Sequence, residues 1–287
     1  MGGGRHRRLR KTGPAACRVG APCEPVAATG VVRMTAASSP VRGVFIVLEG
    51  ADGSGKTALA AEVMDQLRRS GHRVRATRRA DPDGPAEHAA LIRAVGQMFA
   101  RAGDQGTGFD LLSLAAAAQY AAIVHGQVLP AVRRGEIVIA DSWWAKTWVR
   151  LSIEASYRAP QASPGQVGLL RSWQQALWPC PPLSPIPALT VLIDAPQADR
   201  MHWYEAAGRR EPVYDACGAS TRNPAAFAHL TSAIADLLRQ AADQQGWPII
   251  ANGRHLGLQD VAADVIAAVT AQPLWATHRG STACSCA

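Results

Sequence analysis

The chain has 287 residues, of which 48% are hydrophobic and 18% charged, so it is long and apolar enough to bury a substantial core. The formal net charge of +8 comes mainly from residues 1–33, which hold seven basic residues and one acid and leave 23 basic and 21 acidic residues in the rest. The nearly neutral body argues against a nucleic-acid binder, and the lack of about 18 uninterrupted apolar residues argues against a membrane span.

The first 33 residues lack the apolar middle section of a secretory signal, and their Gly, Pro and Arg content gives no helical or strand period. Met34 follows, just ahead of the first convincing strand. We expect residues 1–40 to be a disordered basic leader, with Met34 as a candidate native start; a targeting or nucleic-acid-binding arm is the alternative. The six cysteines lack a recognisable metal-site spacing, which favours a reduced, cytoplasmic protein; they stand at positions 17, 23, 180, 217, 284 and 286.

The first predicted strand is the apolar run Val44–Leu48, which is typical of a strand buried on both faces of a parallel sheet. A Gly-rich turn and a helix near 56–69 follow, and this helix ends at a Ser-Gly pair suited to a C-terminal cap. The alternation then repeats, with strands expected near 73–77, 137–140, 189–193 and 248–251 and helices near 86–101, 110–133, after 141, and near 197–207, 224–245 and 258–270.

Five strands separated by helices predict an α/β fold with one doubly wound parallel sheet and helices on both faces. We expect a single domain over residues 41–272, followed by a disordered tail over 273–287. In such a sheet the active site lies at the carboxyl ends of the strands.

The turn after the first strand fits the phosphate-loop pattern G-x-x-x-x-G-K-[ST] without a gap, in the residues Gly50, Ala51, Asp52, Gly53, Ser54, Gly55, Lys56 and Thr57. Its glycines let backbone N–H groups approach phosphate oxygens, and the next helix points its positive end at the same anion. Lys56 can bridge the outer phosphates, and the Thr57 hydroxyl can coordinate Mg²⁺. Only three of the 30 basic residues are Lys, yet Lys stands at the motif position. The pattern predicts that the chain binds a nucleoside triphosphate.

From residue 43 to about 270 the chain resembles the thymidylate kinase family of nucleoside monophosphate kinases. The resemblance begins at Phe45–Thr57, where the acidic residue inside the phosphate loop is similar to that of the family. It implies a P-loop NTPase fold, ATP as co-substrate, Mg²⁺ as cofactor, and a role for Asp52 in placing the acceptor nucleotide. By the same resemblance, either Arg78 or Arg79 holds the acceptor phosphate.

Two later segments are similar to the family helix that covers the thymine ring, at 111–119, and to the approach to the family's Asp-Arg-Tyr motif, at 133–141. The family arginines of these segments fall at Ala117 and Ser142, so the acceptor half of the site departs from the family pattern. Lys146 and Arg150, four residues apart, share one face of a predicted helix. They are candidates for the missing positive charge; a solvated basic edge is the alternative.

The resemblance also implies a mobile lid between Met201 and Arg222. Arg209 and Arg210 are the candidates for stabilising charge on the transferring phosphoryl group, with Arg222 in reserve. Asp141, at the end of a strand, is the candidate metal-binding carboxylate beside Thr57, and a helix cap is its alternative role.

These features predict Mg²⁺-dependent transfer of a phosphoryl group from ATP to a nucleoside monophosphate, with dTMP as the leading acceptor. The first alternative is a kinase of the same fold that acts on another nucleotide or small molecule. The second is an ATP-binding regulatory module without transfer activity. The resemblance further implies a nucleotide substrate and a homodimer, and the cysteine usage favours a cytoplasmic location.

Overall fold

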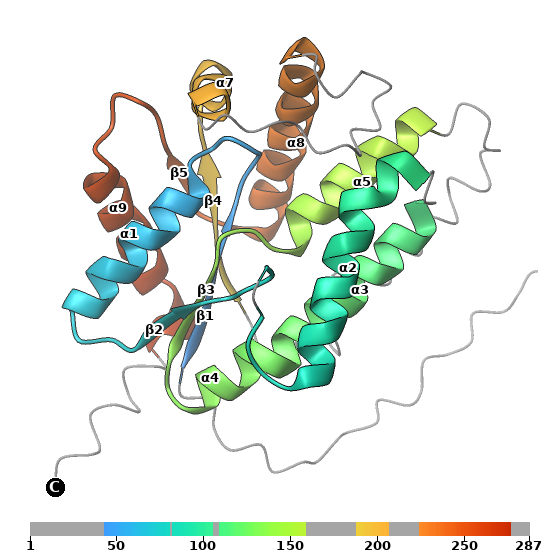
Figure 1. The fold of residues 1–287 in the computed structure, drawn as a ribbon. Helices are drawn as coiled ribbons and strands as arrows, with labels where there is room; N and C mark the ends of the chain where they lie inside the picture. The colour runs from blue at the N-terminus through green and yellow to red at the C-terminus, as the bar shows by residue number, and fades with distance from the viewer. Residues whose placement is uncertain (1–42, 81, 106–108, 159–187, 207–223, 277–287) are drawn as a thin grey trace, which may run out of the picture. The chain divides into compact units, whose positions relative to one another are not determined.

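A five-stranded, all-parallel sheet forms the centre of the fold (Figure 1). The computed structural model describes residues 43–80, 82–105, 109–158, 188–206 and 224–276, which belong to one compact unit of the chain. The strand order is β2-β3-β1-β4-β5, and the strands are β1 (Val44–Glu49), β2 (Val74–Ala76), β3 (Ile137–Ala140), β4 (Ala188–Asp194) and β5 (Ile249–Ala251). The prediction of a doubly wound parallel sheet is therefore confirmed.

The described helices follow the predicted alternation with the strands. They are α1 (Lys56–Arg69), α2 (Ala86–Gln105), α3 (Phe109–Ile123), the π-helix η1 (Val124–Val128), α4 (Leu129–Arg133), α5 (Trp144–Arg158), α7 (Gln197–Ala206), α8 (Pro224–Gln245) and α9 (Leu258–Thr270). The bounds of α1, α8 and α9 agree with those expected from the sequence. The single helix expected over 110–133 is instead divided by η1, which hydrophobic periodicity does not register because a π-helical turn differs from an α-helix in its backbone hydrogen bonds.

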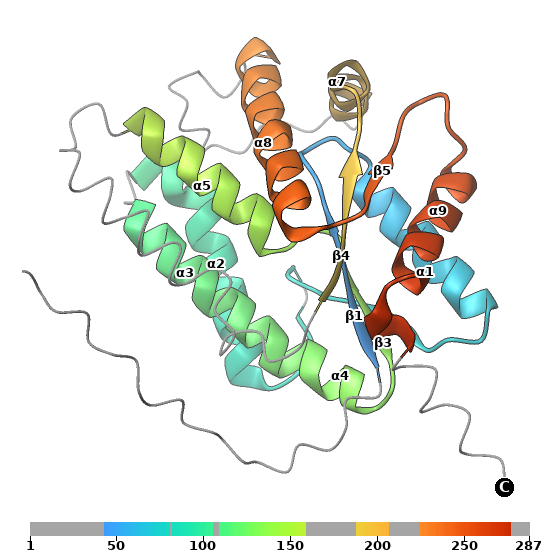
Figure 2. The same ribbon diagram turned by 180° about the vertical axis from the view of Figure 1, so that it is seen from behind.

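Helices cover both faces of the sheet (Figures 1 and 2). On one face, alternate β1 side chains such as Ile46 and Leu48 pack against α1 and α9. On the other face, Phe45 and Val47 pack against α3, η1 and α4, and Leu192 of β4 packs against α5 and α8. The period-two alternation of a strand that is apolar throughout supplies side chains to both layers, which is why β1 is buried along its whole length.

The helical stretch Leu111–Arg133 is the one segment of the described ranges that is long and apolar enough to cross a membrane by length and composition. Of its most apolar window, 67% is buried inside the fold. Polar residues interrupt the stretch, and its buried side chains Ile123, Val128 and Val132 belong to the core beside β1 and β3. This segment is a core helix in the present fold.

The ordered domain continues past the boundary expected at 272. Residues 273–276 form a helical turn, in which Trp275 is 2% exposed and packs edge-on against His72. The indole belongs to the same core cluster as α1 and α9. The expectation that the tail starts at 273 is thus wrong for its first four residues, because a large apolar side chain there completes the core. The leader and all six cysteines lie outside the described residues.

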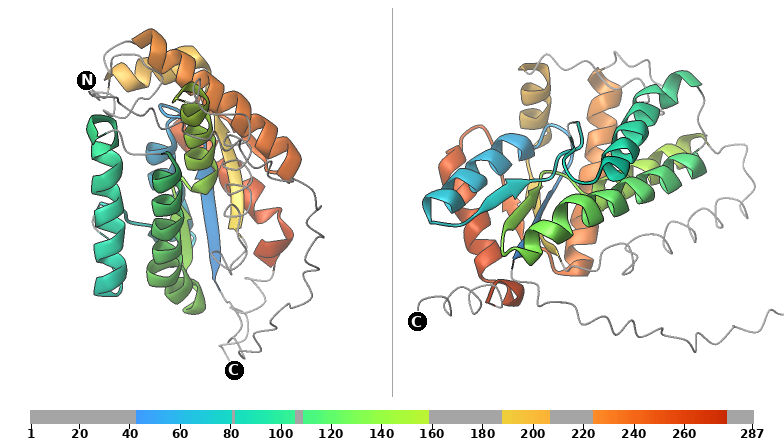
Figure 3. Two further views of the ribbon diagram at one scale, coloured as in Figure 1. Left: turned by 90° about the vertical axis from the view of Figure 1, so that its right-hand side faces the viewer. Right: turned by 60° about the horizontal axis from the view of Figure 1, so that its bottom comes forward.

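The carboxyl ends of β1, β2 and β3 carry the loops that the sequence associates with function. The loop after β1 runs beneath the start of α7, since a Cβ added at Gly53 would lie 2.6 Å from the Arg200 carbonyl oxygen. Figure 3 shows α7 at this end of the sheet and α2 beside α3. The parallel topology therefore brings residues that are far apart in sequence to one edge.

Candidate active site

The phosphate loop, Gly50–Thr57, adopts a conformation that requires glycine. Gly50, Gly53 and Gly55 have φ angles of 155°, 78° and 79°, where other residues are strained. Space is equally restrictive: a Cβ at Gly50 would lie 2.5 Å from the Ile193 carbonyl oxygen. Backbone angle and close packing thus require glycine at the two motif positions, Gly50 and Gly55, and also at Gly53, which the motif leaves open.

Lys56 is 7% exposed and lies over the loop that precedes it. Its Nζ donates to the Ala51 carbonyl oxygen at 2.7 Å and to Ser54 Oγ at 3.3 Å. Burial, with a further contribution from the nearby Lys146, lowers the pKa of Lys56 to about 8, even though Asp52, Glu49 and Asp141 act to raise it. The ammonium group therefore lies where its positive charge would stabilise a phosphate chain bound to the loop.

A side chain from β5's carboxyl end supports the loop. Asn252, 6% exposed, donates from Nδ2 to the Ser54 carbonyl oxygen at 2.9 Å. The same amide nitrogen lies 2.6 Å from where a Gly55 Cβ would stand. Asn252 could not be predicted from the sequence, because a lone Asn after a short strand carries no pattern of its own.

Thr57 and Asp141 meet at the start of α1. The Thr57 hydroxyl donates to Asp141 Oδ2 at 3.0 Å, which joins two hard oxygen groups from the ends of β1 and β3. Among the described residues no group of three or more His, Cys, Asp and Glu is arranged to hold a metal ion. Magnesium does not need such a cage, because it binds through one or two protein oxygens together with phosphate and water. The pair therefore fits Mg²⁺ bound with a nucleotide.

Asp52 faces two cations of α5 across the loop. Lys146 donates from Nζ to Asp52 Oδ1, and Arg150 Nη1 lies 3.6 Å from Asp52 Oδ2. Both cations are mostly buried, with side-chain exposures of 17% and 12%. Burial alone would raise the pKa of Asp52, but Lys146, Arg150 and Lys56 together hold it well below its usual range. Asp52 is therefore ionised, and Lys146 and Arg150 do not form the solvated edge considered as the alternative.

A buried carboxylate fixes the start of α5. Glu49, the last residue of β1, is fully buried and accepts a hydrogen bond from the Ala145 N–H at 3.0 Å. Burial raises the pKa of Glu49, while Lys56 and the backbone donors of Trp143 and Ala145 oppose the rise. A carboxyl group at a helix N-terminus is a favourable arrangement. It ties the helix that carries Lys146 to the strand that carries the phosphate loop.

A cavity of about 350 Å³ opens beside Asp52. Its lining combines three cations with apolar, amide and hydroxyl side chains: Arg79, Ala80, Gly96, Phe99, Ala116, Gln119, Tyr120, Ser142, Lys146, Thr147, Arg150 and Leu151. None of these described lining residues is an Asp or Glu. The cavity is therefore suited to an anion that also carries a flat or apolar group.

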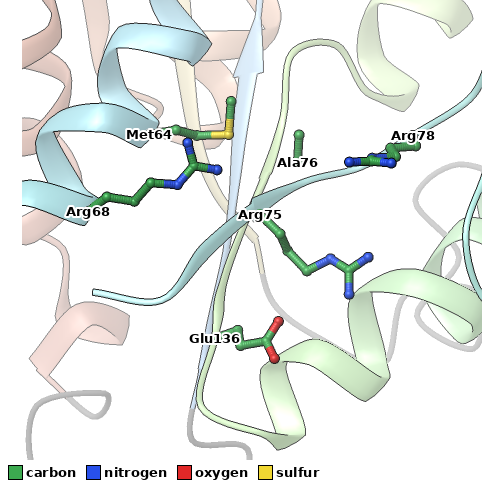
Figure 4. A pocket seen from close by; sticks show the side chains of 6 residues that line it. All are labelled: Met64, Arg68, Arg75, Ala76, Arg78 and Glu136. Atoms are coloured by element: carbon green, nitrogen blue, oxygen red, sulfur yellow. The ribbon is translucent and has the colours of Figure 1, made fainter. Parts of the chain in front are cut away.

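Arg79, rather than Arg78, reaches this cavity. The Arg79 guanidinium donates to the Ser142 carbonyl oxygen at 2.7 Å and to the Tyr120 hydroxyl at 3.1 Å, and it lies over the Tyr120 ring. Arg78 instead lines a second pocket beside β2, with Met64, Arg68, Arg75, Ala76 and Glu136 (Figure 4). Of the two arginines left open by the sequence, Arg79 is the one that shares a cavity with Lys146.

The π-helix η1 holds the backbone of the Arg78–Arg79 segment. Gln127, 1% exposed, accepts from the Arg78 N–H at 2.7 Å and donates from Nε2 to the Arg78 carbonyl oxygen at 2.8 Å. An inserted residue in a helix often marks a functional region. Here it aims a buried amide at the loop that carries Arg79, a role for which the sequence offered no signal.

The two departures from the family pattern have different surroundings. Ala117 is 5% exposed in the core beside β1, and the cavity is lined by its neighbour Ala116. Ser142 lines the cavity and presents its carbonyl oxygen to Arg79. The proposed lid residues Arg209, Arg210 and Arg222 lie outside the described residues.

The sheet, the glycine-shaped loop and the Lys56 ammonium define an α/β protein of the P-loop NTPase fold. No family model matches the chain. A thymidylate kinase from Clavibacter sepedonicus is 31% identical over 206 residues, which cover 72% of this chain and 89% of that protein. The chain belongs to the thymidylate kinase family, a family of nucleoside monophosphate kinases.

Two further relatives are matched over a smaller share of their own length. A thymidylate kinase from Methylococcus capsulatus is 35% identical over 161 residues, 54% of this chain and 64% of that protein. One from Gluconobacter oxydans is 28% identical over 175 residues, 61% of this chain and 74% of that protein. The resemblance drawn from the phosphate loop is confirmed by these matches.

Proposed function

We propose that the chain transfers the terminal phosphoryl group of ATP to a nucleoside monophosphate in the cytoplasm, with dTMP as the leading acceptor. One observation carries the proposal: Asp52 belongs to the phosphate loop and also contacts Lys146 and Arg150, which line the neighbouring cavity. The phosphate loop thus contacts, through Asp52, two cationic residues that line the cavity. A donor phosphate chain and an acceptor phosphate bound at these two places would meet there.

The residues of the loop divide the work of binding the donor. The backbone N–H groups and Lys56 hold the phosphates of ATP, and no step needs a general base of special pKa because the acceptor phosphate is itself a nucleophile. Thr57 and Asp141 would hold Mg²⁺, whose positive charge offsets the charge of the phosphates. Asp52 helps to place the acceptor, and Arg209 and Arg210 close over the transferring group.

A panel of acceptors tests the proposal. Purified protein is incubated with ATP, Mg²⁺ and each of the deoxy- and ribonucleoside monophosphates, and the diphosphate product is measured. We expect dTDP to form fastest. If ATP binds but no monophosphate is converted, the chain is an ATP-binding module and the kinase proposal fails.

A second candidate function is transfer to an acceptor other than dTMP. Ala117 is buried in the core and Ser142 brings no charge to the cavity, so neither supplies the arginine of the family pattern. The same panel, extended to small phosphorylated metabolites, distinguishes the two: a preferred acceptor that is not dTMP supports the second candidate. A homodimer remains an expectation from the family, to be checked by measuring the mass in solution.

A further inference from the structure

Two basic side chains of α5 are directed at one carboxylate of the phosphate loop. Lys146 and Arg150 have side-chain exposures of 17% and 12% and contact different oxygens of Asp52. Removing a cation from water costs several kcal/mol unless an anion and hydrogen bonds compensate it. Such a placement therefore indicates a use beyond solubility.

Packing of the adjacent face of α5 fixes the direction of these cations. Ala145, Val149 and Ile153 belong to the core cluster shared with α8 and β4. Residues three and four apart lie on one face of a helix, so Lys146 and Arg150 form a second face, next to the apolar one. Because core packing sets the rotation of the helix, both cations are held toward the cavity beside Asp52.

Charge in this cavity matches that of a phosphate monoester. Arg79, Lys146 and Arg150 line it, and among the described residues of the lining there is no carboxylate. Counting these three cations with Asp52 leaves an excess of two positive charges among the four groups. A phosphate monoester carries about −1.5 to −2 at pH 7. The four groups thus offer the charge that one acceptor phosphate requires.

We propose that Lys146 and Arg150 bind the phosphate of the acceptor, in place of the arginines that the family pattern expects at Ala117 and Ser142. The inference rests on the proposed function for the identity of the acceptor. Asp52 aligns the two cations, which then bind the phosphate beside Arg79. The positive charge that binds the acceptor phosphate thus comes from α5, whereas the family pattern places it at positions 117 and 142.

Single and double variants test this assignment. In Lys146→Met, Arg150→Met and the double variant, we expect the acceptor Kd, measured by calorimetry without ATP, to rise about tenfold to a hundredfold per cation removed, as for a lost charge-assisted hydrogen bond. The KM for ATP is expected to change less than about twofold, because the loop amides and Lys56 remain. Lys146→Arg, which keeps the charge, is expected to retain most of the affinity.

Arg134→Met is the matched control. It breaks an ion pair with Glu136, 2.7 Å long, at the amino end of β3, and it leaves the acceptor cavity untouched. The assignment is overturned if Lys146→Met and Arg150→Met lower the Tm but leave the acceptor Kd at the wild-type value, since the ion pairs with Asp52 would then be structural only. Circular dichroism establishes that each variant is folded; if the double variant is not, the single variants and Lys146→Arg decide.

Inorganic phosphate and dTMP serve as the binding probes, so the test does not depend on turnover. If no monophosphate is phosphorylated, yet the wild-type protein binds phosphate and the variants do not, the proposed function fails while the phosphate site stands. If dTMP is phosphorylated and the variants bind it normally, the kinase proposal stands and the α5 assignment fails.

Discussion

The phosphate loop, which we propose as the donor loop, and the cavity beside Asp52, which we propose as the acceptor cavity, obtain their positive potential in different ways. The donor loop depends on backbone: Gly50, Gly53 and Gly55 adopt angles that strain other residues, and neighbouring atoms leave no room for a Cβ at any of the three. The acceptor cavity depends on side chains from separate elements. A backbone-built site cannot move to new positions in the sequence, whereas a side-chain charge can be supplied from any nearby helix. Under the proposed assignment of Lys146 and Arg150, this difference accounts for a loop that keeps its motif beside acceptor residues that depart from theirs.

Removing the Lys56 side chain from the donor loop is the strongest way to test this contrast. In Lys56→Ala we expect phosphoryl transfer to fall by roughly 10²–10³, since a preorganised donor to transferring phosphates is lost in a buried site. The rate is measured with saturating ATP and acceptor by a coupled assay, with Arg134→Met as the control. A rate within about threefold of wild type would contradict the assignment of Lys56 to the donor phosphates.

The pH dependence of ATP binding is a second test of the donor loop. The pKa of Lys56 is about 8 in the free protein, so the side chain is charged below that pH and neutral above it. ATP binds better to the charged form; its affinity should therefore be greatest below about pH 8 and fall by up to about tenfold per pH unit above it. The Kd for ATP is measured from pH 7 to 10.

Lys56→Arg is the matched control for this titration, because a guanidinium keeps its charge throughout that range. The fall in affinity above pH 8 should be absent from the variant, whatever its absolute Kd. An equal fall in both proteins would assign the titration to another group.

Much of the fold could be predicted from the sequence because its signals are local. The uninterrupted apolar run of β1, the Gly-rich turn and the cap at Ser70 placed the first strand, loop and helix, and α1 spans Lys56–Arg69 as expected. The break at η1 was missed because an inserted helical residue changes hydrogen bonding without changing hydrophobic pattern. The burial of Trp275 was missed because a single indole after a helix looks like part of a polar tail.

The candidate site could be predicted only where the backbone determines it. The sequence identified the loop and paired Thr57 with Asp141, and it left Arg78 and Arg79 unresolved because their spacing gives no direction. Tertiary packing decides that Arg79 enters the cavity and that Lys146 and Arg150 meet Asp52. Gln127 and Asn252 had no signal, because each acts through a hydrogen bond to the backbone of a distant segment.

Moving a charge within the acceptor cavity is a direct test of side-chain substitution. In a Lys146→Met background, Ser142→Arg is expected to recover about half of the lost acceptor affinity, on a free-energy scale, because position 142 lines the same cavity. Ala117→Arg is the contrasting variant: it places a charge in the core, so it should lower the Tm without restoring affinity. Acceptor Kd and Tm are measured for each protein. Equal recovery of acceptor affinity by both arginines would show that the position of the added charge relative to the cavity does not matter.

The smallest expected effect concerns the segment that carries Arg79. Gln127→Leu removes both hydrogen bonds to the Arg78 backbone, each worth about 0.5–1.5 kcal/mol, which should cost about 1–3 kcal/mol of stability in all. With Arg79 less firmly placed, the acceptor KM should rise about threefold to tenfold while the KM for ATP stays constant. Gln66→Leu is the control, since it removes an amide that donates to the Gln259 carbonyl oxygen on the opposite face of the sheet. A loss of stability with no change in acceptor KM would separate the π-helix from acceptor binding, and would leave the contrast between the two halves resting on α5 alone.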